Sequence, residues 1–598
     1  MTLFARRLDI EPRKKNSAAD VPGETGEWLE TALRLLPLFC AVLVLWLATR
    51  RYFGLSQDAR FYALEALRAL DPNRYAGDLY FQFGSQGGFS LFTSLYRPLV
   101  ALFGTGSAGM GVAIAGQLLW LFGLWRLASS LVGRRFVWLS LALVIAVQGL
   151  YAPYLGYGEA FATPRLFAEA LTMLALSLLR TRPALTAALL ALAACLHPLM
   201  ALPGCVAVFV YLALGRPIYW ILAPAGIGLV MFLGWAGIEP FANLYKTLDP
   251  AWLAVARLRS LQCFVTLWPA DAWFQVLNGF AWGAIGLFAA QGRDRRFLAA
   301  VLAAGLGGLV CTFVGADIAH NVLVVELQPW RAMWLVQVVV RIFIPVTLFS
   351  LLDRRIASPM AVAAALSVAL VLVSSLTRLV RLSHSAEFGW LSFALTAIAL
   401  AAILARTEGM RGRLLTQLLC GLAVAATPVA AWAWDARTPW TKFLEAPEPP
   451  PPDLADLLPR GASVYWEGAA EMAWYRLARP SYFSCDQGTG VVFHRETAMA
   501  YRHRSDSFYP LRTVDFSQAK SCAALDNQTA PERTRSGLQN LCRREPGLDK
   551  LVLIAPIDGV DPKIWKSPIL FQDIHVVDGI YSARSTDRFY IYSCAGLR

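Results

Sequence analysis

Long apolar runs recur along most of this 598-residue chain and constrain its fold more than any other feature. A helix of about 20 apolar residues is long enough to cross the hydrocarbon core of a bilayer. Only 16% of the residues are charged, whereas a typical soluble protein has about 25%. The sequence therefore predicts a polytopic α-helical membrane protein.

The runs predict about 13 spans within a transmembrane domain of residues 32–435. Before it, residues 1–31 are polar and basic and predict a cytoplasmic tail. The predicted spans are residues 32–49, 106–131, 136–150, 165–180, 184–198, 203–214, 217–236, 273–290, 297–316, 331–352, 358–376, 389–405 and 413–435.

Basic residues predict which side of the membrane each gap faces. Counted from a cytoplasmic N-terminus, the gaps after the even-numbered spans hold the basic clusters, which include Arg134, Arg180, Arg216, Arg293, Arg354 and Arg406. Such clusters stay on the cytoplasmic side. They also account for much of the formal net charge of +13, so that charge does not argue for nucleic acid. An odd number of spans places the C-terminal region outside.

The first external gap, residues 50–105, is the longest before the C-terminal region. Phe61, Leu64, Leu67 and Leu70 recur at helical spacing, so residues 58–70 are expected to form an amphipathic helix on the membrane surface. Pro72 follows and is typical of a helix stop.

A proline-rich linker, residues 436–453, separates the spans from a polar C-terminal region. Residues 454–598 predict a small extracytoplasmic α/β domain, with strands at 463–466, 551–554 and 589–592 and a helix at 469–477. An even number of cysteines in an exported domain indicates disulfides, and three pairings are open. These cysteines are Cys485, Cys522, Cys542 and Cys594.

Several segments resemble those of a known superfamily. They are QDARFYAL, DPNRYAGDLYF, TPRLFAEAL, HPLMALPG and QPWRAMWL. With the long first external loop and the external C-terminal domain, they resemble the GT-C-type integral membrane glycosyltransferases. More narrowly, they resemble bacterial multispanning proteins of unassigned substrate that are placed near that superfamily. The resemblance covers most of the membrane part.

The resemblance implies a function and a location. It implies a protein of the bacterial inner membrane that transfers a sugar, with inversion, from a polyprenyl-phosphate carrier to an extracytoplasmic acceptor. The acceptor would be a glycan, a lipid or a protein, and the C-terminal domain would bind or position it.

Asp58 is the candidate general base, because an acid in the first external loop has this role in the superfamily. Transfer to a hydroxyl needs a carboxylate within hydrogen-bond reach of that hydroxyl. Many members have paired acids where this chain has Gln57 and Asp58. One carboxylate is a poor site for a divalent cation, so a metal cofactor stays open and no metal ligand is assigned. Asp58 is equally suited to capping the surface helix.

Two acids and an arginine are candidate substrate-binding residues in the external gaps. Asp78 follows Gly77 and suits either a turn or a cavity wall. Glu159 and Arg165 flank Thr163 and the start of the fourth span. In the first turn of a helix the dipole disfavours a cation, so Arg165 is expected to have a partner, either Glu159 or a lipid phosphate.

Two further arginines and two histidines complete the candidate set. Arg331 opens the tenth span, where it would bind the departing lipid phosphate or reach the lipid headgroups. Arg341 lies ten residues further, about 15 Å deeper by helical rise. His197 and His320 lie at an outer span end and in an outer loop. Either would orient substrate or serve in packing.

The alternative function is non-enzymatic, as a transporter or assembly partner for lipid-linked saccharides. A transporter would be expected to have paired internal repeats with matching broken helices, and none is evident in the sequence. No nucleotide-binding or common hydrolase motif stands out either. The sequence therefore favours the enzyme.

Overall fold

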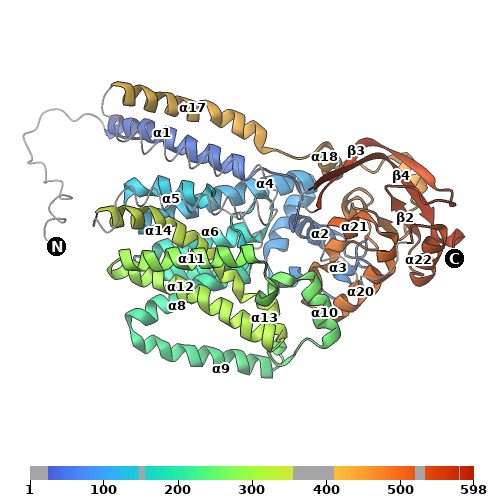
Figure 1. The fold of residues 1–598 in the computed structure, drawn as a ribbon, viewed down its shortest axis with the longest axis horizontal. Coiled ribbons are helices and arrows are strands. Elements are labelled where there is room, and N and C mark those ends of the chain that lie inside the picture. Colours follow the sequence, from blue (N-terminus) through green and yellow to red (C-terminus); the bar gives the residue numbers. More distant parts are fainter. Residues whose placement is uncertain (1–23, 147–154, 354–409, 519–531, 578–579) are drawn as a thin grey trace, which may run out of the picture.

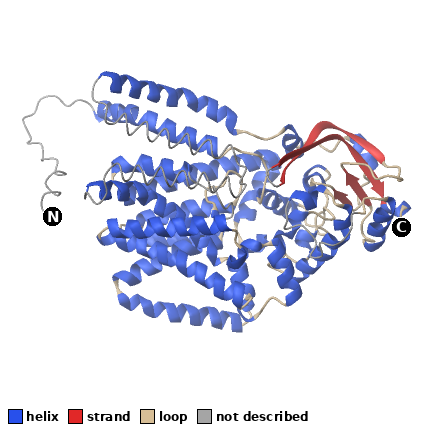
Figure 2. Ribbon diagram, in the orientation of Figure 1, coloured by secondary structure: helices blue, strands red, loops and turns tan. Residues whose placement is uncertain are grey.

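A computed structural model describes residues 24–146, 155–353, 410–518, 532–577 and 580–598. Helices make up most of the described chain, and the strands gather at one end (Figure 2). The helices of the membrane part lie side by side, and the C-terminal domain sits beyond one end of them (Figure 1).

The helical part is that of a multi-pass membrane protein. In the described part of the chain, six helical segments are long and apolar enough to cross a membrane, and four shorter apolar helices accompany them. The long ones are formed by α4 (Phe92–Leu131), α8 (Pro198–Gly215), α9 (Leu222–Trp235), α11 (Ala270–Ala289), α12 (Gly292–Thr312) and α14 (Met333–Asp353). The shorter ones lie in α1 (Glu24–Thr49), α5 (Arg134–Ala146), α7 (Pro183–Leu196) and α17 (Met410–Trp434), and α6 (Pro164–Leu178) packs among them.

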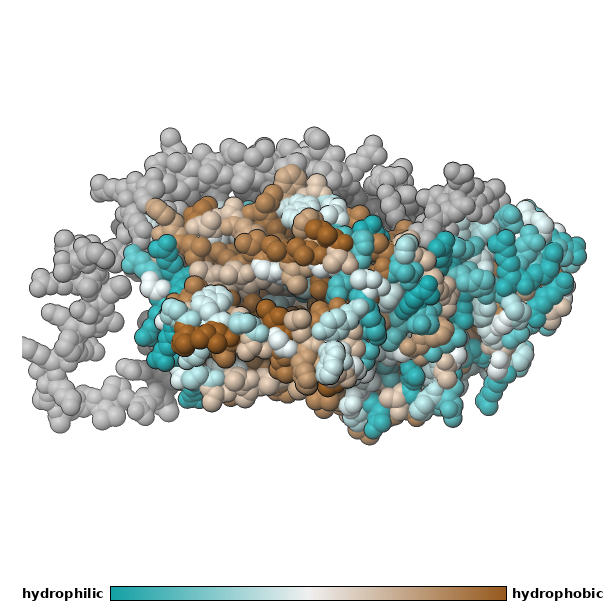
Figure 3. Space-filling view, turned by 90° about the horizontal axis from the view of Figure 1, so that it is seen from below, coloured by the Kyte–Doolittle hydropathy of each residue, from teal (hydrophilic) through white to brown (hydrophobic). Residues whose placement is uncertain are grey.

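The hydropathy of the surface differs between the helical part and the C-terminal domain. Hydrophobic residues cover much of the helical part, whereas the C-terminal domain is largely hydrophilic (Figure 3). The predicted spans 358–376 and 389–405 lie outside the described residues, so the count of 13 stays a prediction. The orientation of the termini stays a prediction as well.

Helix α4 begins earlier than the sequence indicates. It starts at Phe92, inside the predicted loop 50–105, and continues to Leu131. Gly104 breaks its regular geometry with a φ of 73°, a conformation that glycine adopts without steric cost. The expected span of 106–131 is thus the part of α4 beyond this kink.

The expected helix after Asp58 is present as α2 (Ala59–Leu70). Both of its faces are covered. Tyr62 contacts Phe92 of α4 edge-on, with ring centroids 5.4 Å apart. Phe61 lies 5.8 Å from the ring of Trp474 in the C-terminal domain. Helix α2 therefore packs between the membrane part and the C-terminal domain rather than lying on a bare membrane surface.

The C-terminal domain is built on a four-stranded sheet of order β1-β2-β4-β3. Its strands are β1 (Val464–Trp466), β2 (Lys550–Leu553), β3 (Lys563–Val577) and β4 (Ile580–Ser593). Strand β1 pairs with β2 in parallel, and the other pairs are antiparallel. The sequence predicted three of these strands and missed β3. The helix expected at 469–477 is present as a short π-helix, Met472–Arg476.

Short helices connect and surround these parts. They are α3 (Leu79–Gln82), α10 (Pro250–Arg259), α13 (Val322–Leu327), α18 (Pro439–Glu445), α19 (Pro452–Leu457), α20 (Arg495–Phe508), α21 (Val514–Gln518) and α22 (Arg535–Arg544). Helix α18 lies within the predicted linker, before its proline run at 447–452.

The buried carboxylate of Asp78 joins the first external loop to the C-terminal domain. One of its oxygens accepts hydrogen bonds from Trp474 Nε1 at 2.7 Å and from the Ser481 amide at 3.0 Å. The other accepts from Gln487 Nε2 at 2.8 Å and from the Tyr80 amide at 3.0 Å. Burial raises the pKa of Asp78, and these hydrogen bonds oppose that rise. Three of the four donors belong to the C-terminal domain, so this side chain fixes its position.

Replacing Asp78 with Asn should loosen this attachment. Whichever way the amide is oriented, its NH₂ group faces two donors and leaves them unsatisfied. Such a loss costs about 1–3 kcal/mol. Thermal unfolding of the purified protein should show a lower midpoint for Asp78→Asn. The exposed Asp71→Asn serves as the control and should change little, and equal midpoints for the two variants would contradict this role.

The disulfide prediction is confirmed in the C-terminal domain. Cys542 on α22 and Cys594 at the end of β4 are joined by a disulfide. Cys485 is also disulfide-bonded, and Cys522 lies outside the described residues. Disulfides are typical of oxidising compartments outside the cytoplasm.

Removing the Cys542–Cys594 bond should destabilise the C-terminal domain. The bond closes a loop with a sequence separation of 52. Replacing both cysteines with Ser should lower the free energy of unfolding by about 2–4 kcal/mol. Denaturant-dependent proteolysis of the C-terminal region in the intact protein measures this loss. The free, exposed Cys195→Ser is the control. If unreduced protein showed Cys542 and Cys594 as alkylatable thiols, the bond would not exist.

Candidate functional site

A polar cavity of about 220 Å³ lies where the first external loop, the outer helix ends and the C-terminal domain meet. Four predicted site residues line it together, although they are spread over more than 270 positions. They are Asp58, Arg165, His197 and Arg331. Gln57, Arg60, Tyr62, Arg259, Gln328, Asp486, Thr489 and Phe493 also line the cavity.

Arg165 joins two acids at the cavity wall. Its Nη1 atom lies 2.7 Å from Asp58 Oδ2, and its Nε atom lies 2.9 Å from Glu159 Oε1. Thr163 precedes α6, but its hydroxyl donates to Glu159 at 2.7 Å instead of capping the helix. The expected partner of Arg165 is thus Glu159, with Asp58 as a second partner that the sequence did not indicate. Two carboxylates offset the unfavourable position of this cation at a helix start.

The carboxylate of Asp58 is held in its ionised form. Burial alone would raise the pKa of Asp58, but the charge and hydrogen bond of Arg165, with Arg331 and Arg60 further away, outweigh burial and lower that pKa. Asp58 occupies the position before α2, yet its side chain makes no capping hydrogen bond. Its carboxylate therefore faces Arg165 and the cavity, and an ionised acid of this kind can accept a proton.

Arg331 is a cavity cation that has no acidic partner among the described residues. It lies in the short turn before α14, where its Nε atom donates to Gln328 Oε1 at 2.8 Å and its guanidinium lies 4.8 Å from the Trp330 ring centroid. His197, between α7 and α8, has a buried Nδ1 atom with no hydrogen-bond partner among the residues that the structure describes. Both side chains can interact with an anion in the cavity.

The C-terminal domain supplies the opposite wall, which the sequence did not predict. Arg60 of α2 lies 2.5 Å from Asp486 and 2.8 Å from Glu471, both in that domain. Arg259, at the end of α10, donates to the Cys485 carbonyl at 3.1 Å. Arg60 lies two residues after Asp58, so its place near the cavity could have been predicted from the sequence. No sequence pattern indicates that Arg60 or Arg259 contacts residues more than 200 positions away.

Four predicted site residues do not line the cavity. Glu159 pairs with Arg165, as described above. Asp78 binds the C-terminal domain, as described above. His320 lies 3.3 Å from Arg257 and takes a left-handed backbone conformation with a φ of 50°. Arg341 is buried within α14 and donates to the Tyr157 hydroxyl at 3.1 Å.

An apolar groove of about 460 Å³ adjoins the cavity on the membrane side. Its walls come mainly from α4, and Leu95 and Phe103 there are each 60% exposed. The two hollows share a wall. Leu196 of the groove precedes His197 of the cavity, and Phe92 of the groove packs on Tyr62 of the cavity. An amphiphile with a polar head and an apolar chain would fit across this wall.

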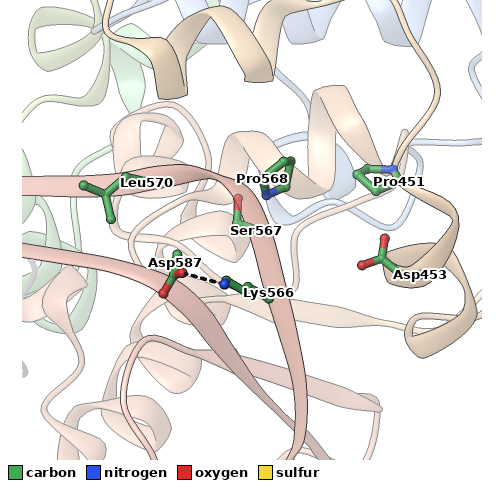
Figure 4. A pocket seen from close by; sticks show the side chains of 7 residues that line it. All are labelled: Pro451, Asp453, Lys566, Ser567, Pro568, Leu570 and Asp587. Carbon is green, nitrogen blue, oxygen red and sulfur yellow. Dashed lines mark ion pairs between the residues drawn. The ribbon is translucent and has the colours of Figure 1, made fainter.

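A larger, shallow depression on the C-terminal domain is lined by Asp453, Lys566 and Asp587 among others, with Lys566 and Asp587 3.7 Å apart (Figure 4). It lies on the outer surface of that domain and shares no residue with the cavity. Among the described residues, no group of three or more His, Cys, Asp or Glu side chains could hold a metal ion.

Comparisons with known proteins give no assignment. No protein-family model matches the chain, and no curated protein matches it either. The site must therefore be interpreted from its own geometry.

Replacing Arg165 with Gln should destabilise the protein in a pH-dependent way. The change leaves Asp58 and Glu159 without their cation. The cost is about 1–2 kcal/mol at neutral pH, because both carboxylates are partly exposed. The native pKa of Asp58 lies below its unfolded value, so the stabilisation is present above about pH 4 and is lost as the pH falls through the native pKa.

Thermal unfolding midpoints of the parent and of Arg165→Gln, measured from pH 7 down to pH 3, test this. The two curves should converge at the acid end. Arg74→Gln, which breaks an exposed pair with Asp71, is the control and should follow the parent throughout. A constant gap between the curves would contradict the account.

Proposed function

We propose that this protein is a membrane glycosyltransferase of GT-C type. It transfers a sugar from a polyprenyl-phosphate carrier to a hydroxyl of an extracytoplasmic acceptor, in the bacterial inner membrane. The observation that carries the proposal is the joint position of Asp58, Arg165 and Arg331 around one cavity that adjoins an apolar groove.

The groove and the cavity together support a lipid-linked donor. A polyprenyl chain is apolar and suits the wall of α4. Its phosphate suits the guanidinium of Arg331, which has no acidic partner in the described part of the chain. A soluble nucleotide sugar has no apolar chain that would occupy the groove.

The ionised Asp58 supports the role of general base. In the proposed step, the acceptor oxygen attacks the anomeric carbon and passes its proton to Asp58. The bond from that carbon to the phosphate oxygen breaks, and its electron pair leaves with the lipid phosphate. Arg331, with Arg165 beside it, would stabilise the charge on that phosphate. Attack opposite the leaving group inverts the anomeric configuration.

Replacing Asp58 with Asn tests this function. Asn keeps the size and still accepts a hydrogen bond from Arg165, but it cannot take a proton from a hydroxyl at neutral pH. The rate should fall about 10²–10⁴-fold, the usual contribution of a general base. The assay follows labelled sugar from a panel of polyprenyl-phosphate sugars into an envelope fraction that supplies the acceptor.

The matched control is Asp71→Asn, on the same loop but outside the cavity. It should keep the parent rate, and both variants should purify in normal yield. If Asp58→Asn transferred sugar at the parent rate, Asp58 would have no catalytic role. If the parent moved the lipid-linked sugar across a membrane without transfer, the alternative of a transporter would replace the enzyme.

A further inference from the structure

The wall that the C-terminal domain gives to the cavity has its own chemistry. It comes from residues 486–493, which present the carboxylate of Asp486, the side chain of Thr489 and the ring of Phe493. The Asp486 side chain is 37% exposed, and Arg60 is its ion-pair partner among the described residues. A carboxylate has about four acceptor sites, so most of those of Asp486 remain for a ligand.

This wall is held rigidly from behind. Ser484 and Gln487 form a capping box at its start, and Gln487 also donates to Asp78. Trp252 Nε1 of α10 donates to the Val491 carbonyl at 2.7 Å. Arg259 donates to the Cys485 carbonyl, as noted above. A binding surface fixed in this way loses little entropy when a ligand arrives.

The size and lining of the cavity fit one sugar ring. At about 220 Å³ it is smaller than the roughly 300–1,000 Å³ of pockets for drug-sized ligands, so an oligosaccharide does not fit. A monosaccharide has hydroxyls on its edge and C–H groups on its face. The Asp486 carboxylate can accept from two hydroxyls, and the Phe493 ring can pack on an apolar face.

We propose that Asp486 and Phe493 of the C-terminal domain bind the sugar ring of the donor. This inference rests on the proposed function, since it places the sugar beside the phosphate at Arg331. It assigns the C-terminal domain to the recognition of the donor, in addition to any role with the acceptor.

The test compares binding of two lipids to the full-length protein in nanodiscs. One is a polyprenyl phosphate, and the other is the same lipid carrying a hexose or pentose from a panel. The parent should bind at least one sugar-bearing lipid more tightly than the bare phosphate. Loss of hydrogen bonds to a charged group should weaken binding of that lipid to Asp486→Asn by roughly 10–100-fold, with the bare phosphate unaffected. Phe493→Leu should also weaken only the sugar-bearing lipid.

Glu471→Gln is the matched control. It breaks the other half of the Arg60 pair, but Glu471 does not line the cavity, so preference for the sugar should persist. If Asp486→Asn kept that preference, or if Glu471→Gln lost it equally, the sugar-binding role would be wrong while the phosphate site stood. If the parent bound neither lipid, the proposed function and this inference would both fail.

Discussion

The hydrogen bonds to the buried Asp78 carboxylate are the interaction on which the rest of the site depends. The cavity has two walls, one from the membrane part and one from the C-terminal domain, so it exists only while these parts stay in place. Three donors from the C-terminal domain converge on this one side chain of the first loop. One of them, Gln487, also belongs to the capping box that shapes the wall at residues 486–493. Attachment and site geometry are therefore set by the same residues.

Charge is distributed unequally within the cavity. Arg165 and Arg60 each contact two carboxylates, whereas Arg331 and Arg259 contact neutral groups. Paired arginines fix the acids in place and keep Asp58 ionised. The arginines without acidic partners leave positive charge available for an incoming anion. The adjoining groove of α4 gives a reason for that anion to arrive on a lipid, because its walls are apolar and include the exposed Leu95 and Phe103.

Local patterns carried much of the prediction. Apolar runs located the helices, and the spacing of Phe61, Leu64, Leu67 and Leu70 located α2. The unfavourable place of Arg165 in its helix correctly indicated a partner. Contacts between distant segments were not predictable, because no local pattern encodes them. Arg60 with Asp486, and Asp78 with Trp474, join residues about 400 positions apart. For His320 and Arg341 the sequence indicates only depth and side, and in the fold they contact Arg257 and Tyr157.

The most direct test of the central claim is a structure of the full-length protein with a polyprenyl-phosphate sugar bound. We expect density for the phosphate beside Arg331, with the chain following the groove of α4 past Phe92 and the sugar between Asp58 and Asp486. Density for the lipid elsewhere on the protein, with the cavity filled only by water, would contradict it.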